Sequence, residues 1–362
     1  MQNCGSYSKK IFADLNLIHT DMKAAIYNPY WDTLGGGERY TISFAKVLTE
    51  LGYRVDVQWK DNDLMKRIEE RFGIKSVDIN VVSDIKKGDG YDICFWISDG
   101  SIPLLRSRNN ILHFQVPFTD VKGDSLMNKM KLYRVKKVIC NSQFTKKVID
   151  KEYRINSIVV YPPCDTTKIK PKRKENIILS VGRFSQLLQS KHQDILIEVF
   201  IKLIKKGVTD WKLVLAGGSG VGGVEYLDGL KKEAEKYPIE FHEDPDYKEI
   251  IELYGRSKIF WSASGYAENE QRNPEKVEHF GIALIEAMAG GCVPVVLNAG
   301  GHKEIIGENN GYLWSKRAEV VRITRDLITD GKLLRNVSKN AIVSSKTFGY
   351  ERFKESVEKI LQ

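Results

Sequence analysis

The chain has 362 residues, which is longer than one hydrophobic core usually supports, so two domains are expected. Hydrophobic residues make up 42% and charged residues 28%, the proportions of a soluble globular protein, and no apolar run approaches the roughly 20 residues that span a bilayer. The net charge of +9 suits nucleic acid, an anionic membrane surface or a phosphate-bearing substrate as partner, but no nucleic-acid-binding signature accompanies it.

Residues 1–21 have neither a signal-peptide hydrophobic core nor a cleavage-site pattern, and they predict a short amphipathic helix or a disordered extension. The five cysteines are scattered without metal-ligand spacing, and their number is odd. This usage suits a reducing cytoplasm and argues against a zinc site or a disulfide framework. We therefore expect a cytoplasmic protein.

The N-terminal half begins with a β-α-β unit. The pattern predicts a strand at Lys23–Tyr27, a helix at Glu38–Leu51 and a second strand at Arg54–Gln58. Strands that alternate with helices imply a parallel sheet and an α/β fold. Gly36 and Gly37 lie where the first strand passes into the helix, so they are candidates for close approach of a ligand to the backbone, although tight turns use glycines too.

Two further strands are predicted in this half, at Tyr91–Ile97 and Asn110–Gln115. The second carries His113. A single histidine on a strand is more often packed in a core than functional, so both interpretations remain open for His113. A Pro-Pro pair at Pro162 and the lysine-rich run after it, which extends to Asn176, predict the boundary between the domains.

Basic residues concentrate between Lys122 and Lys151. They are Lys122, Lys129, Lys131, Arg134, Lys136, Lys137, Lys146, Lys147 and Lys151. The simplest interpretation is a solvated, lysine-rich surface. The functional alternative is a docking face for anionic lipid headgroups.

The second half starts with a strand at Asn176–Gly182, followed at once by Arg183. Lys191 comes eight residues later and precedes a clear helix. Side chains at the carboxyl end of a parallel strand and at the start of the next helix converge where open α/β sheets bind ligands. Two cations there fit a diphosphate, although each is also compatible with plain surface charge.

A glycine-rich loop follows the next strand, Trp211–Ala216, and begins with Gly217. Gly218, Gly220 and Gly223 have the spacing of a dinucleotide-binding fingerprint between a strand and a helix. Possible ribose-binding carboxylates lie about 20 residues further on. They are Glu240, Glu243 and Asp244. This is the main evidence for an NAD(P)-dependent oxidoreductase, an alternative that leaves Arg183, Lys191 and the glutamates described next unexplained.

Glu278 and Glu286 are eight residues apart, and the residues after Gly281 have a helical pattern. If the helix begins near Phe280, the amides of Gly281 and Ile282 are free at its N-terminus, where backbone amides and the helix dipole bind phosphate. Glu286 then lies one turn deeper on the same face. This arrangement suits a sugar nucleotide, whereas an ordinary amphipathic helix with two surface glutamates is the alternative.

The segment from Glu278 to Glu286 with its internal Phe-Gly, continued by Glu-Ala-Met-Ala-Gly-Gly and Val-Pro-Val, resembles the donor-site signature of the retaining glycosyltransferases of family 4. That resemblance implies the GT-B fold, two Rossmann-like domains that face each other across a central cleft. It predicts an N-terminal extension, an acceptor domain, a donor domain and a terminal helix that crosses back, at residues 1–21, 22–172, 173–340 and 341–362.

The resemblance also assigns roles to residues. In the family the glycine loop around Gly36 and Gly37 faces the donor phosphates, a histidine matching His113 faces the transferred sugar, and an arginine and a lysine matching Arg183 and Lys191 bind phosphate. The spacing between those two cations is longer here than in the family. Glu278 is expected to hold sugar hydroxyls, Glu286 the nucleotide ribose, and Gly217, Phe280, Gly281 and Ile282 complete the predicted nucleotide site.

The predicted reaction is transfer of a hexose from a nucleoside-diphosphate sugar to a glycan or lipid-linked glycan, with retention at the anomeric carbon. Cationic side chains, Arg183 and Lys191, are expected to balance the diphosphate in place of a metal ion, so we expect no metal requirement and no cofactor. The His-Phe-Gly signature and the Gly-Gly-Gly-Glu-Arg segment resemble those of mannosyltransferases of lipid-linked oligosaccharides, which favours GDP-mannose. A sugar-nucleotide epimerase of the same fold remains an alternative. The expected location is the cytoplasm, peripherally on the inner face of a membrane.

Overall fold

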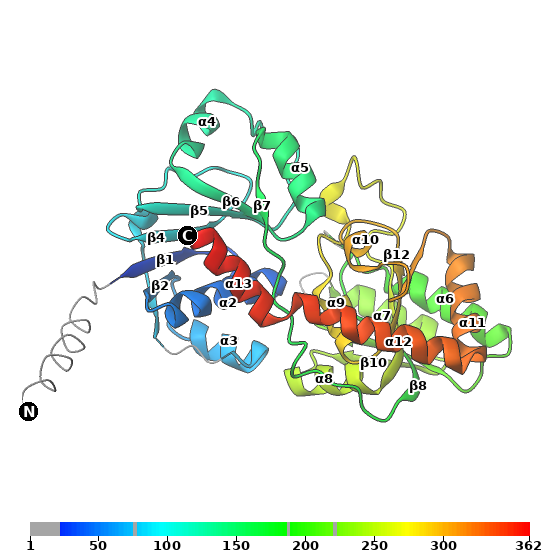
Figure 1. Cartoon of the computed structure of the whole chain (residues 1–362). Helices are drawn as coiled ribbons and strands as arrows, with labels where there is room; N and C mark the ends of the chain where they lie inside the picture. The colour runs from blue at the N-terminus through cyan, green and yellow to red at the C-terminus, as the bar shows by residue number, and fades with distance from the viewer. Residues whose placement is uncertain (1–21, 75–77, 187–188, 220–222) are drawn as a thin grey trace, which may run out of the picture.

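The computed structural model describes residues 22–74, 78–186, 189–219 and 223–362. The predicted helix within residues 1–21 lies outside the described residues, and so does Gly220 of the glycine-rich loop. Two parallel β-sheets form the centres of two domains that lie side by side (Figure 1). The described chain contains no helix that is long and apolar enough to cross a membrane.

The N-terminal domain is built on a seven-stranded sheet in the order β3-β2-β1-β4-β5-β6-β7. Its strands are β1 (Lys23–Tyr27), β2 (Arg54–Gln58), β3 (Ile79–Val82), β4 (Ile93–Ile97), β5 (Asn109–Phe114), β6 (Val135–Cys140) and β7 (Ile158–Val159). Its helices are α2 (Gly36–Glu50), α3 (Leu64–Phe72), the short 3-10 turn η1 (Lys86–Gly88), α4 (Leu126–Leu132) and α5 (Gln143–Tyr153). All strand pairs are parallel, as the alternation of strands and helices predicts.

The C-terminal domain has a six-stranded parallel sheet in the order β10-β9-β8-β11-β12-β13. Its strands are β8 (Glu175–Val181), β9 (Lys212–Gly217), β10 (Ile239–Glu243), β11 (Ser257–Ser262), β12 (Val293–Leu297) and β13 (Tyr312–Trp314). Its helices are α6 (Gln193–Lys205), α7 (Gly223–Ala234), α8 (Tyr247–Arg256), the 3-10 turn η2 (Pro274–Lys276), α9 (Ile282–Ala289), α10 (His302–Ile305), α11 (Arg317–Thr329) and α12 (Gly331–Ser345).

Buried apolar residues cover both faces of each sheet, which is why strands such as β12 are apolar at every position. In the N-terminal domain, one core lies under α2 and α3 and another under α5. In the C-terminal domain, one core lies under α6, α7 and α11, and the other lies under α8 and α9. Each domain therefore has the three-layer arrangement of a doubly wound fold.

The chain returns to the N-terminal domain at its end. After the 3-10 turn η3 (Lys346–Phe348), helix α13 (Tyr350–Leu361) runs from α12 to α2, and Figure 1 shows it bridging the two domains. Phe353, Val357 and Ile360 enter the core beneath α2. The crossing expected of the terminal helix is thus present in the structure, and its apolar positions explain why it packs there.

Candidate functional site

One cavity of about 550 Å³ lies between the two domains. It is lined by residues that follow the carboxyl ends of strands in both sheets and by the N-terminal ends of α2 and α9. All of the predicted site residues are among its lining residues: Gly36, Gly37, His113, Arg183, Lys191, Gly217, Glu278, Phe280, Gly281, Ile282 and Glu286. The structure thus brings the predicted set together at one place, while the role of each residue stays a prediction.

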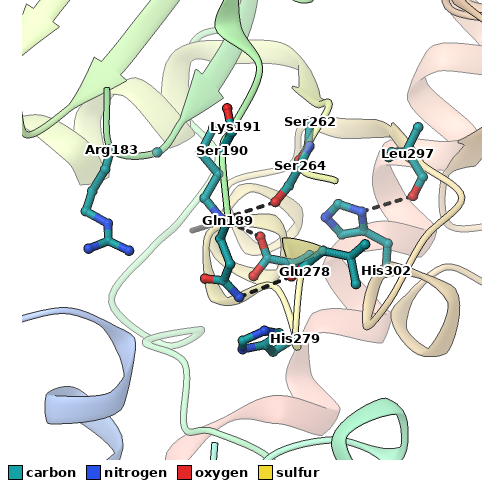
Figure 2. A network of polar contacts seen from close by, with 12 residues as sticks. Arg183, Gln189, Ser190, Lys191, Ser262, Ser264, Glu278, His279, Leu297 and His302 are labelled. Carbon is teal, nitrogen blue, oxygen red and sulfur yellow. Dashed lines mark hydrogen bonds and ion pairs between the residues drawn. The ribbon is translucent and has the colours of Figure 1, made fainter. Parts of the chain in front are cut away.

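Lys191 and Glu278 form an ion pair in this cavity. The Lys191 Nζ donates to Glu278 Oε2 at 2.8 Å and also lies 3.3 Å from Ser264 Oγ (Figure 2). The unusual spacing before Lys191 therefore does not remove it from the site. Gln189, in the same loop, donates to the backbone oxygen of Val277 at 3.1 Å, which fastens the loop to the segment that carries Glu278.

Two histidines surround Glu278 and influence its ionisation. Burial opposes the charge on Glu278, but Lys191 and the neighbouring His302 and His279 together lower its pKa to about 2. Burial lowers the pKa of His279 to about 4 and also lowers the pKa of His302. The Nδ1–H of His302 donates to the backbone oxygen of Leu297 at 3.0 Å, which fixes its ring beside the carboxylate (Figure 2).

Arg183 comes two residues after the end of β8, and its side chain is exposed toward the cavity. Within the described part of the chain, its guanidinium has no hydrogen-bond or ion-pair partner, and Figure 2 shows it separate from the Lys191–Glu278 pair. It is therefore a cation available to an anionic ligand. Lys191, by contrast, has its charge already balanced by Glu278.

Helix α9 begins at Ile282, two residues after Phe280, with Gly281 as its N-cap at φ 121°. Within the described residues, the amides of Gly281 and Ile282 have no hydrogen-bond acceptor. The Phe280 ring does not line the opening freely but is 3% exposed and stacks on Tyr161, with ring centroids 5.4 Å apart. The backbone of this turn, and not the aromatic ring, is the part that can receive a phosphate.

Glycines allow the backbone to approach closely at two points of the cavity. A Cβ on Gly37 would lie 2.1 Å from Gln115 Oε1, and a Cβ on Gly217 would lie 2.1 Å from the backbone oxygen of Gly182. At Gly36, a Cβ would touch Ile282 Cδ1 at 3.0 Å, so the start of α2 faces the start of α9 across the cleft. Two helix N-termini with their positive dipole ends thus face the same cavity.

Glu286 is bound by a residue that sequence analysis missed. Arg39, on α2 of the N-terminal domain, forms an ion pair with Glu286, and its second amino group lies 3.3 Å from Asp165 Oδ2. Tyr247 donates a hydrogen bond to the same Asp165. Burial opposes the charge on Arg39, but Glu286 and Asp165 outweigh burial and raise its pKa. The only signal in the sequence was the position of Arg39, two residues after the predicted phosphate-facing glycines.

His113 takes the packed arrangement that sequence analysis left open. Its side chain is fully buried on β5 and stacks on Tyr40, with ring centroids 4.2 Å apart. Burial lowers its pKa to about 3, so the imidazole is neutral at physiological pH. It is also among the residues that line the cavity, so its predicted contact with the sugar stays a prediction.

Of the three carboxylates that the dinucleotide fingerprint suggested, two are paired elsewhere, and the third, Asp244, lies beside Gly218 but is not among the residues that line the cavity. Gly218 lines the cavity, but Glu240 pairs with Lys212 at 2.9 Å and Glu243 with Lys231 at 2.5 Å, outside it. The described residues also contain no cluster of three or more acidic, cysteine or histidine side chains that could hold a metal ion. The metal-independence expected from the sequence remains untested by this observation.

Residues 165–343 match the model of a protein family described as "Glycosyl transferases group 1". This segment contains Arg183, Lys191 and both glutamates. The chain belongs to the group 1 glycosyltransferases. The resemblance stated from the sequence is therefore confirmed.

Among curated relatives of this glycosyltransferase is the alpha-1,3/1,6-mannosyltransferase ALG2 of Yarrowia lipolytica. It is 24% identical over 79% of this chain and 80% of its own length. The GDP-Man:Man(3)GlcNAc(2)-PP-Dol alpha-1,2-mannosyltransferase of Neurospora crassa is 30% identical over 44% of this chain, and the human protein of that name is 26% identical over 62%. The matched segments cover 30% and 49% of those two proteins, less than two thirds of their length.

Solved structures share the fold. HepE of Anabaena, solved in complex with UDP and glucose, superposes with a TM-score of 0.72 at 18% identity, over 94% of this chain and 99% of its own. The sucrose-phosphate synthase of Thermosynechococcus elongatus superposes with a TM-score of 0.71 at 16% identity, over 94% and 98%. The expected GT-B arrangement of two Rossmann-like domains is thereby confirmed.

Proposed function

We propose that this glycosyltransferase moves a hexose, with mannose favoured, from a nucleoside-diphosphate sugar to a glycan or lipid-linked glycan with retention of configuration. The observation that carries the proposal is the convergence of cations, free amides and carboxylates on one interdomain cavity. Arg183 and the amides at the start of α9 are available to a diphosphate, and the carboxylates beside them suit hydroxyl groups.

The proposed chemistry is a front-face displacement. The acceptor hydroxyl oxygen bonds to the anomeric carbon while the bond from that carbon to the donor phosphate oxygen breaks on the same face. The acceptor proton passes to an oxygen of the departing diphosphate. Arg183, Lys191 and the α9 amides stabilise the charge that develops on this leaving group. No second carboxylate is placed as a covalent nucleophile in this scheme, so the two-carboxylate logic of retaining glycosidases does not apply.

Mannose is favoured because relatives that match this chain are named as mannosyltransferases, and several of them, including the Neurospora crassa and human proteins, are named for GDP-Man. Their names also include a PP-Dol acceptor, which supports a lipid-linked glycan here. We further propose that the protein associates from the cytoplasm with an anionic membrane through the basic segment Lys122–Lys151. Metal is not required in this proposal because cations of the chain itself balance the leaving diphosphate.

The first test is a thermal-shift panel of GDP-, UDP- and ADP-sugars, with NAD(P)H as comparison, in the presence of EDTA. We expect stabilisation by a sugar nucleotide, with GDP-mannose strongest, and none by NAD(P)H. Transfer to a lipid-linked glycan is then followed with labelled donor, and NMR of the product reads its anomeric configuration. Stabilisation by NAD(P)H alone, or an inverted product, contradicts the proposal.

Incubation of donor without acceptor separates transfer from epimerisation. The proposal predicts the unchanged sugar nucleotide together with slow hydrolysis, whereas an epimerase converts the donor into its epimer. A Glu278→Ala variant adds a test of the site: we expect it to lower turnover more than nucleotide affinity. Loss of nucleotide affinity alone would mean that the roles of Glu278 and Glu286 are exchanged.

A further inference from the structure

Helix α4 carries a concentration of exposed apolar side chains in the N-terminal domain. Nine large hydrophobic residues in the described chain are exposed, and four of them lie on or next to this one helix. Their exposed fractions are 76% for Leu126, 61% for Met127, 64% for Met130 and 94% for Tyr133. None of the residues of α4 is buried. A short helix with this exposed apolar surface is not part of a core, and such a surface marks an interaction site.

The four side chains share one face of the helix. At about 100° per residue, positions 126, 127, 130 and 133 fall within an arc of roughly 120°. Lys129 and Lys131 flank this arc on its two sides. Leu132 points the opposite way, because it packs against the core under α5. The orientation of the helix is thus set by Leu132, and it turns the apolar arc toward solvent.

The segment before α4 is held firmly in this position. The Glu152 carboxylate, on α5, accepts hydrogen bonds from the amides of Val121 and Gly123, both at 3.1 Å. Ser125 caps the helix by accepting from the amide of Asn128 at 3.3 Å. The apolar arc is therefore presented by a fixed platform on the outer side of the N-terminal domain, where Figure 1 shows α4 beside α5.

The charge around the arc is strongly positive. Residues 121–137 contain six basic side chains and one acidic side chain, Asp124. Asp124 is itself neutralised by an ion pair with Arg154 at 3.1 Å. An apolar face flanked by lysines matches the interfacial helices that lie in the headgroup region of anionic membranes. A second copy of this chain is a poor occupant, since two such faces would repel each other.

We propose that α4 is the membrane-inserting element of this protein: its apolar arc enters the acyl boundary of an anionic bilayer while Lys129 and Lys131 reach the headgroups. This deepens the proposed membrane association, which named only the basic charge, and it does not depend on sugar transfer. The lysines can extend their apolar stems along the inserted face and keep their ammonium groups at the phosphates.

Cosedimentation of the full chain with phosphatidylcholine vesicles, with and without phosphatidylserine, tests the proposal. We expect binding only with phosphatidylserine. The Leu126→Ser/Met130→Ser variant is expected to lose roughly tenfold in partitioning. Removing Lys129 or Lys131 by substitution with alanine is expected to cost roughly fivefold each. As matched control, Lys339→Ala/Val343→Ser changes one lysine and one equally exposed apolar residue on α12, where Val343 is 64% exposed.

A fluorescence experiment reports insertion directly. In a Cys4→Ser background, Met130→Cys or Val343→Cys is labelled with an environment-sensitive dye; the other four cysteines are buried. A blue shift with anionic vesicles is expected at residue 130 and not at residue 343. Unchanged vesicle binding of Leu126→Ser/Met130→Ser, or equal spectra at the two sites, would overturn the proposal. So would a dimer in solution that the same double variant abolishes, because the arc would then be a self-association surface.

Donor-induced thermal shifts are expected to be unaffected in all α4 variants, which keeps this test separate from that of sugar transfer.

Discussion

Arg183 and Lys191 line the same cavity, yet their electrostatic surroundings differ. Lys191 is paired with Glu278 at 2.8 Å, whereas Arg183 has no partner among the described residues. A donor diphosphate would meet Arg183 directly, but it would have to share Lys191 with a carboxylate. The two cations therefore have different expected contributions to transfer.

Replacing Arg183 by alanine is expected to lower the turnover number by roughly 10²–10³, because the side chain acts as a preorganised donor to the leaving diphosphate. Since Arg183 is exposed, the free energy of unfolding should change by less than about 0.5 kcal/mol. Steady-state kinetics and urea titration measure the two quantities. Arg322→Ala, an exposed arginine on α11, serves as the control. Wild-type turnover in Arg183→Ala would end this assignment.

His113 makes stability depend on pH. Its folded-state pKa of about 3 is below the ordinary value of 6.5, so the unfolded chain binds the proton more tightly. The stabilisation is complete above pH 6.5 and is lost as pH falls toward 3. Between pH 7 and pH 5 this one group should reduce the free energy of unfolding by roughly 2 kcal/mol. His279 and His302 act in the same direction because burial lowers their pKa values too.

A His113→Phe variant isolates this contribution, because a phenyl ring can stack on Tyr40 without titrating. We expect its urea-derived free energy of unfolding to fall by roughly 2 kcal/mol less than that of the wild type between pH 7 and pH 5. Identical pH profiles would contradict the prediction. The turnover of the same variant tests the predicted contact between His113 and the sugar, since a purely packed histidine can be replaced with little effect on catalysis.

At the scale of elements, the site lies where strands end and the following helices begin. β8 and β9 end side by side, so Gly182 and Gly217 bring Arg183 and the glycine-rich loop to the same edge. On the other side of the cleft, α2 begins at Gly36 against Ile282 of α9. Gly217 meets a backbone oxygen, which explains why glycine is needed at a position that carries no chemistry of its own, whereas Gly36 meets the side-chain methyl of Ile282.

A Gly217→Ala substitution is expected to destabilise the protein by roughly 1–3 kcal/mol, because its Cβ would lie 2.1 Å from a backbone oxygen that no side-chain rotation can move. It should also lower donor affinity, since the end of β9 would shift from β8. Gly229→Ala, in α7 with no atom within 4 Å of the added Cβ, is expected to stabilise by about 0.5–1 kcal/mol. Urea titrations of both variants check the prediction, and equal effects would refute it.

At the scale of the molecule, polar contacts around the cavity join the two domains. Arg39 reaches from α2 to Glu286 on α9. Glu304, on α10, accepts hydrogen bonds from the amides of Gln143 and Phe144 at the start of α5, at 2.8 and 3.3 Å. Helix α13 adds an apolar crossing. The relative position of the domains thus depends in part on Arg39 and Glu286, which also line the cavity.

Removing Arg39 is expected to loosen this connection. In Arg39→Ala, Glu286 is left buried without its cation, which should cost about 3–5 kcal/mol. We expect calorimetry to show one cooperative transition in the wild type and two separated transitions in the variant. Arg108→Ala removes an exposed ion pair with Asp92 inside one domain and should shift stability by less than about 1 kcal/mol. A single, unshifted transition in Arg39→Ala would contradict the prediction.

The sequence alone predicted the alternation of strands and helices, the parallel sheets, the crossing terminal helix, and the set of residues around the cavity. The alternation and the sheets follow from local periodicity and from the rule that strand ends collect at one edge of a parallel sheet, whereas the full set of site residues also relied on the resemblance to the family 4 glycosyltransferases. Helix α9 begins at Ile282, two residues later than the predicted start near Phe280, because Gly281 takes a positive φ and serves as the N-cap.

The tertiary structure decided which side chains are partners of one another. Arg39 meets Glu286 across 247 residues of sequence, and no short-range pattern encodes such a pairing. The burial of His113 under Tyr40 likewise depends on how α2 packs on the sheet. The exposure of Leu126 and Met130 could not be read from their apolar character, which by itself predicts a core position. Residue type and spacing determine which groups can act, but the packing of distant segments determines which of them are paired, buried or left open.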